Sequence, residues 1–316
     1  MMLMRNLGHS DLTISAVGLG CNNFSRPGTP TATLDGTKSV LDAAIEHGIT
    51  FLDTAELYGD PKGGSEDLMG QALVGRRENL VIATKFGHMA GGPEGSETWG
   101  APGSAAYIAH AVEGSLTRLR TDRIDLYQLH TPDATTPIGD TIEALAGLIQ
   151  VGKVRFIGHS NLTAEQIYEA DSVAKELGLP PFVSAQNEYS LMARGVEADV
   201  LPAVRDLGLG FLPYFPLHNG LLTGKYTRSG GEGRLTRQRP EVLESLDWDL
   251  MERYQALCDE AGVTMLEATF AWLLTQDAVS SVIAGATRPE QVEANAKAGM
   301  TVLDADVTAA ISALFA

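Results

Sequence analysis

Residues 125–159 read DLYQLHTPDATTPIGDTIEALAGLIQVGKVRFIGH, and the order of structures that they predict decides the fold. The short apolar run Asp125–His130 predicts a strand, and apolar residues three and four positions apart predict a helix over Ile138–Val151. Gly152 suits the left-handed residue that ends a helix, and a second strand-like run follows at Val154–His159. Two strands joined by a helix form a parallel βαβ unit.

The same alternation extends along the chain in both directions. The strand candidates are Ala16–Gly20, Thr50–Asp53, Leu80–Lys85, Asp125–His130, Val154–His159, Val183–Asn187, Gly210–Tyr214 and Ser281–Ala284. The helix candidates are Lys38–His47, Ser65–Leu73, Ala105–Leu119, Ile138–Val151, Ala164–Leu177 and Pro289–Gly299. Eight strand–helix units close most simply into a (β/α)8 TIM barrel of roughly 250 residues.

The 316 residues leave room for additions to such a barrel. We expect an N-terminal β-hairpin at Met4–Ser15, and extra loops at the barrel mouth formed by Gly87–Ser104 and His218–Asp247. A final helix is expected at Asp304–Ala316, so the whole chain, 1–316, is predicted to be a single domain. The alternative is a doubly wound dinucleotide-binding sheet, which normally carries G-x-G-x-x-G after its first strand. Gly18-Leu-Gly20 lacks the third glycine of that motif.

The charge balance argues against two classes of partner. Lys and Arg number 23 against 40 Asp and Glu, which gives a net charge of −17. A nucleic acid needs clustered cations, and an anionic membrane surface repels an acidic chain. We therefore expect neither partner, and because no window approaches 18 uncharged apolar residues, we expect a cytoplasmic protein.

The potential metal ligands are few and poorly spaced. Cys21 and Cys258 are the two cysteines, too few for a disulfide framework or a cysteine metal site. The seven histidines show no spacing such as H-E-x-x-H. We expect no metal.

Four chemically complementary side chains lie at or just after the ends of three consecutive predicted strands. Asp53 and Tyr58 follow the second strand, Lys85 ends the third and His130 ends the fourth. Reactive groups of a barrel collect at these carboxyl ends. A phenol donates a proton near neutral pH only when a cation such as Lys85 stabilises its phenolate. A buried ammonium in turn needs a carboxylate such as Asp53, and His130 would hydrogen-bond a substrate carbonyl oxygen.

Each of these residues also has a purely structural interpretation. Asp53 and Lys85 could form a structural ion pair between adjacent strands. His130 could be a buried histidine without a chemical role, and Tyr58 could pack over the turn at Gly59. Four complementary groups at consecutive strand ends nevertheless favour a catalytic site.

The surrounding motifs add a family resemblance. Residues 48–59, GITFLDTAELYG, with SEDLMG at 65–70 behind them, resemble the signature of the aldo-keto reductase superfamily. Five later segments resemble family motifs in order: 81–87, 125–130, 152–161, 221–226 and 283–288. The resemblance implies a (β/α)8 barrel that reduces aldehydes and ketones with NAD(P)H and needs no metal. It also implies that Tyr58 is the proton donor, that Lys85 and Asp53 tune it, and that His130 orients the carbonyl.

The resemblance further implies a cofactor site along the later strands. Ser160, Asn161 and Gln186 match the positions that bind the nicotinamide carboxamide, and Tyr214 matches the aromatic ring under the nicotinamide. Phe215 replaces a serine expected near the pyrophosphate, since Tyr-Ser-Pro-Leu appears here as YFPL. The remaining positions that match the pyrophosphate and adenosine sites are Leu217, Gly220, Leu222, Gly224, Lys225, Gly285, Thr287, Arg288, Gln291 and Asn295.

The structural alternative for the carboxamide-binding residues is capping of strand ends, and for Arg288 a surface position before a proline. A guanidinium nevertheless suits the 2′-phosphate of NADP. We therefore expect NADP(H) as the cofactor rather than NAD(H).

Substrate choice is expected to depend on the loops at the mouth, with Asn22, Asn23, Trp99 and His218 as pocket candidates. Trp99 could equally anchor its loop on the barrel rim. The predicted function is NADPH-dependent reduction of a small carbonyl substrate. The alternatives are a nicotinamide-binding regulatory protein resembling potassium-channel β subunits, with little turnover, and a barrel that has lost catalysis. The physiological substrate, the reaction direction and the oligomeric state do not follow from the sequence.

Overall fold

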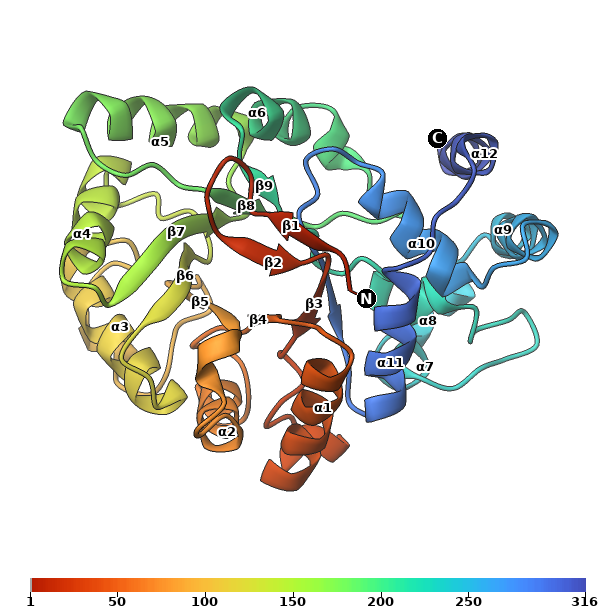
Figure 1. Cartoon of the computed structure of the whole chain (residues 1–316), viewed down its shortest axis with the longest axis horizontal. Helices are drawn as coiled ribbons and strands as arrows, with labels where there is room; N and C mark the ends of the chain where they lie inside the picture. Colours follow the sequence, from red (N-terminus) through yellow and green to blue (C-terminus); the bar gives the residue numbers. More distant parts are fainter. Residues whose placement is uncertain (1) are drawn as a thin grey trace.

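The computed structural model describes residues 2–316, and eight parallel strands form a ring at its centre (Figure 1). The strands are β3 (Val17–Gly20), β4 (Phe51–Asp53), β5 (Val81–Phe86), β6 (Ile124–Leu129), β7 (Val154–Ser160), β8 (Ser184–Gln186), β9 (Gly210–Phe211) and β10 (Val282–Gly285). From β3 to β9 each strand pairs with the next, and β10 pairs with β3. The ring closes where the Phe211 N–H donates to the Ala278 oxygen at 2.7 Å and the Phe211 oxygen accepts from the Ser280 N–H at 2.9 Å. The predicted (β/α)8 barrel is confirmed.

Helices cover the outside of the ring (Figure 1). They are α1 (Leu34–Glu46), α2 (Gly64–Ala72), α3 (Ala105–Leu119), α4 (Ile138–Gln150), α5 (Ala164–Leu177), α6 (Val200–Leu207), α10 (Met265–Leu274) and α11 (Pro289–Ala298). The local signals explain their ends. Thr163 and Gln166 form a reciprocal capping box at the start of α5, and Gly178 ends that helix with φ of +64°.

Helices α6, α9 (Trp248–Glu260) and α10 were not predicted from the sequence, and one predicted strand ends early. Helix α6 has only eight residues, which is shorter than the window of about 11–18 residues over which a helical period is recognised. Helix α10 is buried on most of its surface and therefore has no polar face to reveal its period. The predicted strand Gly210–Tyr214 ends at Phe211, because Pro213 has no N–H to continue the ladder.

The predicted hairpin is present as β1 (Met4–Asn6) and β2 (Thr13–Ser15), paired antiparallel. It crosses one end of the barrel (Figure 1). Its side chains Leu7, Leu12 and Ile14 are buried in a core cluster with strand residues that include Phe51 and Ile283. The hairpin therefore plugs the amino-terminal end of the barrel.

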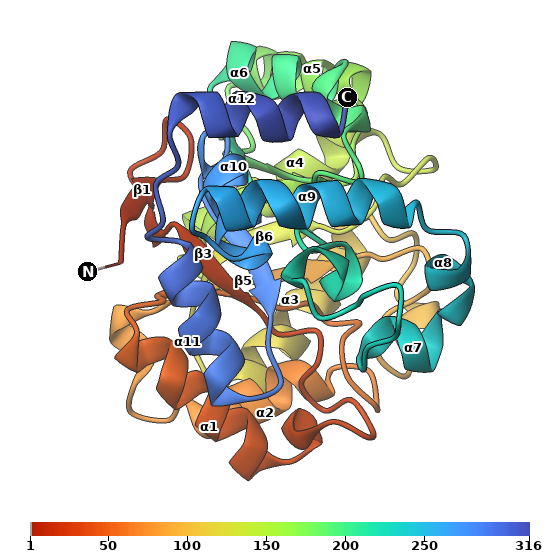
Figure 2. The ribbon, with the colours of Figure 1, turned by 90° about the vertical axis from the view of Figure 1, so that its right-hand side faces the viewer.

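The other additions also form. Insert Gly87–Ser104 contains one 3₁₀ turn, Ser96–Thr98, and further 3₁₀ turns lie at Pro30–Ala32, Arg77–Asn79 and Gly195–Glu197. The second insert contains a 3₁₀ segment, His218–Thr223, and the short helices α7 (Arg234–Gln238) and α8 (Pro240–Glu244). Helices α9 (Trp248–Glu260) and α12 (Ala305–Leu314) pack outside the ring (Figure 2). None of the helices within residues 2–316 is long and apolar enough to cross a membrane.

Candidate active site

A buried ion pair joins the ends of β4 and β5. Lys85 Nζ donates to Asp53 Oδ2 at 2.7 Å and to the Thr54 oxygen at 2.9 Å. The amides of Gln128 and Gln186 donate to Asp53 Oδ1 at 3.4 and 3.0 Å, so both carboxylate oxygens have partners. Burial lowers the pKa of Lys85, but Asp53 and Tyr58 together outweigh this and leave that pKa above its usual value. Lys85 therefore stays charged in a buried site.

Tyr58 lies next to this pair, on the loop between β4 and α2. Its carbonyl oxygen accepts from the N–H groups of Gly63 and Ser65 at 3.2 and 3.1 Å, which fixes the loop. Lys85 Nζ is 5.2 Å from the centre of the Tyr58 ring. Burial raises the pKa of the Tyr58 hydroxyl, Lys85 opposes that rise, and the net shift is upward. The phenol is thus protonated at neutral pH, beside the cation that would stabilise its phenolate.

His130 follows β6 and completes the group. Its ring lies edge-on to Tyr58, with 5.8 Å between ring centres, and 4.5 Å from the ring of His88. Burial and the charge of Lys85 hold the pKa of His130 well below its usual range. Its Nδ1 is buried without a partner in the described part of the chain. The imidazole is therefore neutral, and one N–H donor of a neutral ring suits a carbonyl oxygen.

A hydrogen-bonded chain runs from His130 across the next strand ends. Asn161 Nδ2 donates to the His130 oxygen and to Ser160 Oγ, both at 3.0 Å. Ser160 Oγ donates to the Gln186 oxygen at 2.7 Å, and Tyr214 Oη donates to Asn161 Oδ1 at 2.9 Å. The structure thus brings the predicted carboxamide-binding residues together beside the four catalytic candidates.

Residues 16–316 match the family described as "Aldo/keto reductase family". The chain belongs to this family. It is 34% identical to the Uncharacterized oxidoreductase YrpG of Bacillus subtilis, over 98% of this chain and 94% of the relative. It is 35% identical to a Probable voltage-gated potassium channel subunit beta of Arabidopsis thaliana, over 94% and 91%. It is 32% identical to the L-glyceraldehyde 3-phosphate reductase of Escherichia coli K12, over 94% and 87%. Family membership and these relatives make this aldo-keto reductase an oxidoreductase.

The segment of this aldo-keto reductase that is predicted to bind the pyrophosphate turns at two glycines and carries Lys225. Gly220 and Gly224 have φ of +89° and +78°, and a Cβ added at Gly220 would meet Lys225 Nζ at 2.7 Å. Lys225 therefore folds back over Gly220, and burial together with Arg237 lowers its pKa. Phe215, which replaces the expected serine, lies with its ring centre 5.8 Å from the Arg234 guanidinium.

The positions that match the adenosine site gather at the start of α11. The N–H of Thr287 donates to Gln291 Oε1 at 2.8 Å, and Asn295 is buried one turn further along the helix. Arg288 is exposed and has no ion pair with any carboxylate between Met2 and Ala316. Its guanidinium is free to meet an anion.

The predicted pocket residues do not all converge on Tyr58. A Cβ at Gly285 would lie 3.0 Å from Asn23 Nδ2 and 3.6 Å from Asn22 Oδ1, so these asparagines lie beside the end of β10. Trp99 packs on Tyr107 and His110 of α3, with ring centres 5.4 and 5.5 Å away. These are the contacts expected of a loop anchor. His218 is half-buried, and burial lowers its pKa.

Sequence reasoning missed two buried polar residues of the site. Gln128 lies on β6 two residues before His130 and donates to Asp53, and this spacing could have revealed that both side chains lie on one face. Glu56 lies inside the quoted signature but is fully buried, and no sequence pattern signals that burial. In the part of the chain that the structure describes, no cluster of three His, Cys, Asp or Glu side chains could hold a metal ion.

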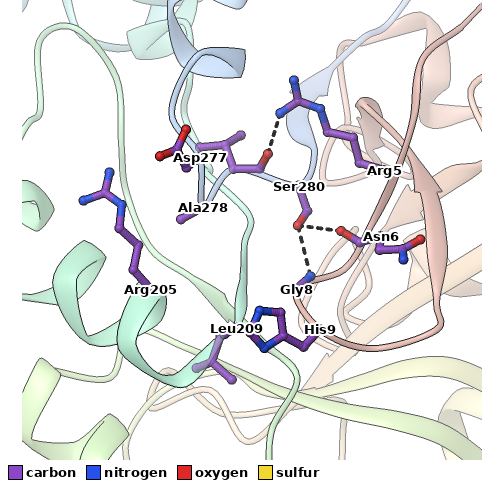
Figure 3. Close-up of a pocket in the computed structure, with 11 residues that line it drawn as sticks. Arg5, Asn6, Gly8, His9, Arg205, Leu209, Asp277, Ala278 and Ser280 are labelled. Atoms are coloured by element: carbon purple, nitrogen blue, oxygen red, sulfur yellow. Dashed lines mark hydrogen bonds between the residues drawn. The ribbon is translucent and has the colours of Figure 1, made fainter.

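A polar cavity of about 560 Å³ lies at the opposite end of the barrel, beside the hairpin (Figure 3). Arg5 donates to the oxygens of Val279 and Leu274 at 2.8 and 2.9 Å, and Ser280 Oγ donates to the Asn6 oxygen at 3.1 Å. These bonds tie the hairpin to the segment before β10. Active sites of such barrels lie at the carboxyl ends of the strands, so this cavity is not the candidate active site.

Proposed function

We propose that this aldo-keto reductase reduces small aldehydes or ketones to alcohols with NADPH, and that Tyr58 donates the proton. One observation carries the proposal: Asp53, Tyr58, Lys85 and His130 form one contiguous cluster at the carboxyl ends of β4, β5 and β6. We also propose that the chain acts as a single domain in the cytoplasm.

The later strand ends suit a nicotinamide dinucleotide. Hydroxyl and amide groups of Ser160 and Asn161 lie next to the partly exposed ring of Tyr214, and they offer both donors and acceptors for a carboxamide. Lys225 and the exposed Arg288 are the cations at the sequence positions expected to contact the phosphates, and a guanidinium suits the 2′-phosphate of NADP. When bound, this cofactor would supply the hydride that adds to the carbonyl carbon.

The residues of the chain would handle the carbonyl oxygen. The neutral His130 donates an N–H to that oxygen and places it beside Tyr58. As negative charge develops on the oxygen, the Tyr58 hydroxyl transfers its proton to it, and Lys85 stabilises the resulting phenolate. Asp53 keeps Lys85 charged throughout. The alcohol leaves with one added hydride and one added proton.

The test is oxidation of NADPH, followed at 340 nm, across aromatic aldehydes, α-dicarbonyls, sugar aldehydes and a phosphorylated aldehyde, with NADH in parallel. Tyr58→Phe should lower kcat by about 10²- to 10⁴-fold, the usual contribution of general acid catalysis. Tyr168→Phe is the matched control, because Tyr168 is exposed on α5. Unchanged turnover in Tyr58→Phe would refute the assigned role.

The second candidate is a nicotinamide-dependent regulatory subunit. It is favoured by the 35% identity to potassium channel β subunits of Arabidopsis thaliana and Oryza sativa. Tight NADPH binding without turnover on the whole panel, together with recovery of a stoichiometric membrane partner, would support it against the reductase.

A further inference from the structure

A buried carboxylate lies directly behind the four catalytic candidates. Glu56 is two residues before Tyr58 and has no exposed surface. Its N–H donates to the Lys85 oxygen at 3.0 Å. Its Oε1 accepts from the N–H of Gly87 at 2.8 Å and from Tyr107 Oη at 2.7 Å. Glu56 is thus bonded to the strand that carries Lys85 and to helix α3.

These bonds fasten both ends of the insert Gly87–Ser104. Gly87 begins the insert, and Tyr107 lies in the first turn of α3, just after it. A Cβ at Gly92 would meet Tyr107 Oη at 2.6 Å and Glu56 Oε1 at 3.2 Å, so the middle of the insert passes over the same bond. The insert carries His88, whose ring touches that of His130. The Glu56 carboxylate therefore links the insert to the catalytic group.

The charges around Glu56 leave its carboxylate without a cation of its own. Arg118 on α3 donates to Glu66 on α2 at 2.8 Å. Glu66 opposes a charge on Glu56, and Arg118 favours that charge but by less. The remaining facing groups are the phenols of Tyr107 and of Tyr127 on β6. Neither Glu56 Oε2 nor Tyr127 Oη has a hydrogen-bond partner within the described residues. The negative charge of the Glu56 carboxylate is therefore buried without a direct ion-pair partner among the described residues.

Burial raises the pKa of Glu56 to about 7, although the bonds from Gly87 and Tyr107 lower it. Both protonation states are therefore populated near neutral pH. An ionised carboxylate accepts stronger hydrogen bonds than a neutral carboxylic acid does. The insert is accordingly held more firmly above this pH than below it.

We propose that Glu56 is a positioning residue of the reductase site, and that its ionised carboxylate holds the insert Gly87–Ser104 against His130 in the form that binds the carbonyl substrate. The inference rests on the proposed function. Protonation of Glu56 loosens the insert without breaking the Asp53–Lys85 pair, so it acts mainly on KM and less on kcat.

The first experiment is the pH profile of kcat and KM between pH 5.5 and 9. Wild-type kcat/KM should fall up to tenfold per pH unit below about pH 7, mostly through KM. Glu56→Gln should abolish this fall in kcat/KM at low pH, which we call the acidic limb of the profile. The variant should also keep a raised KM at pH 8, because its neutral amide mimics the protonated carboxyl group. Glu143→Gln, an exposed glutamate on α4, makes the same change of charge and should keep the wild-type limb.

Tyr107→Phe provides a second test that does not need Glu56→Gln to fold. It removes one hydrogen bond that favours the ionised carboxylate, so the limb should move to higher pH. A limb that stays near pH 7 in both Glu56→Gln and Tyr107→Phe would overturn the proposal, because another group would then be titrating.

A fluorescence titration separates this inference from the proposed function. Trp99 packs on Tyr107 and on His110, so the titration uses a His110→Phe background, in which no imidazole stacks on the tryptophan. The tryptophan emission of this protein without substrate should change near pH 7. The change should be absent in Glu56→Gln and present in Glu143→Gln. If the His110→Phe protein shows this transition but wild-type protein reduces no carbonyl, the proposed function fails while the proton-linked anchoring stands. If turnover is normal and Glu56→Gln keeps the transition, the inference fails alone.

Discussion

The buried His159 should make the protein sensitive to acid. The side chain lies on β7 with no exposed surface and packs against Phe182, with 5.3 Å between ring centres. Neither ring nitrogen has a partner in residues 2–316. Burial lowers the pKa of His159 to about 3, whereas an unfolded histidine titrates near 6.5. Below about pH 6.5 His159 therefore binds a proton in the unfolded chain but not in the folded protein. The free energy of unfolding falls with pH until the folded protein also binds that proton, at about pH 3.

The linkage gives the size of the effect. Between pH 7 and pH 5 the difference in proton uptake at this one site lowers the free energy of unfolding by about 2 kcal/mol. His159→Leu, an apolar side chain of similar volume, removes the titration. We expect the loss of stability between pH 7 and pH 5 to be smaller by about that amount in the variant.

The assay is urea unfolding of wild type and His159→Leu at both pH values, with midpoints and slopes compared. His9→Leu, an exposed histidine in the hairpin, should behave as the wild type does. If His159→Leu loses as much stability as the wild type between the two pH values, the buried neutral histidine is not the source of the acid sensitivity.

Two further changes test the site itself. Asp53→Asn should cost about 3–5 kcal/mol of stability in urea, because it leaves the Lys85 ammonium buried without a counter-charge. The control is Asp11→Asn, which makes the same change at an exposed turn and should alter stability little; an equally small effect of Asp53→Asn would mean that the buried pair is not needed for folding. Arg288→Ala should raise KM for NADPH by about tenfold or more, the worth of a charge-assisted contact to phosphate, and leave KM for NADH nearly unchanged. An equal rise for both cofactors would remove Arg288 from the 2′-phosphate site.

The parts of the fold that follow from sequence are the short buried strands and the helices that are buried on one side only. Strands such as Val154–Ser160 appear as short apolar runs between turn residues, and α5 shows both its period and its caps. Helix α10 cannot be predicted in this way because most of its surface is buried, so that apolar residues lie on all its faces and no apolar–polar period remains. Period-based prediction depends on solvent contacting one side of an element.

The candidate site also contains residues that the sequence predicts and residues that it does not. Asp53, Lys85 and His130 are predictable because they end consecutive strands of a parallel barrel, whose carboxyl ends meet at one mouth. Glu56 is not predictable as a buried group, since its burial depends on Gly87 and Tyr107, which come from distant parts of the chain. Contacts of that kind exist only after the barrel has closed.

The hairpin plug has a consequence for synthesis of the protein. Leu7, Leu12 and Ile14 leave the ribosome long before Ile283 of the last barrel strand, which is part of their docking surface. Arg5 likewise bonds to the Val279 oxygen, 274 residues further along the chain. The nascent polypeptide therefore carries this apolar segment unburied through most of barrel synthesis, and a chaperone can bind it during that time.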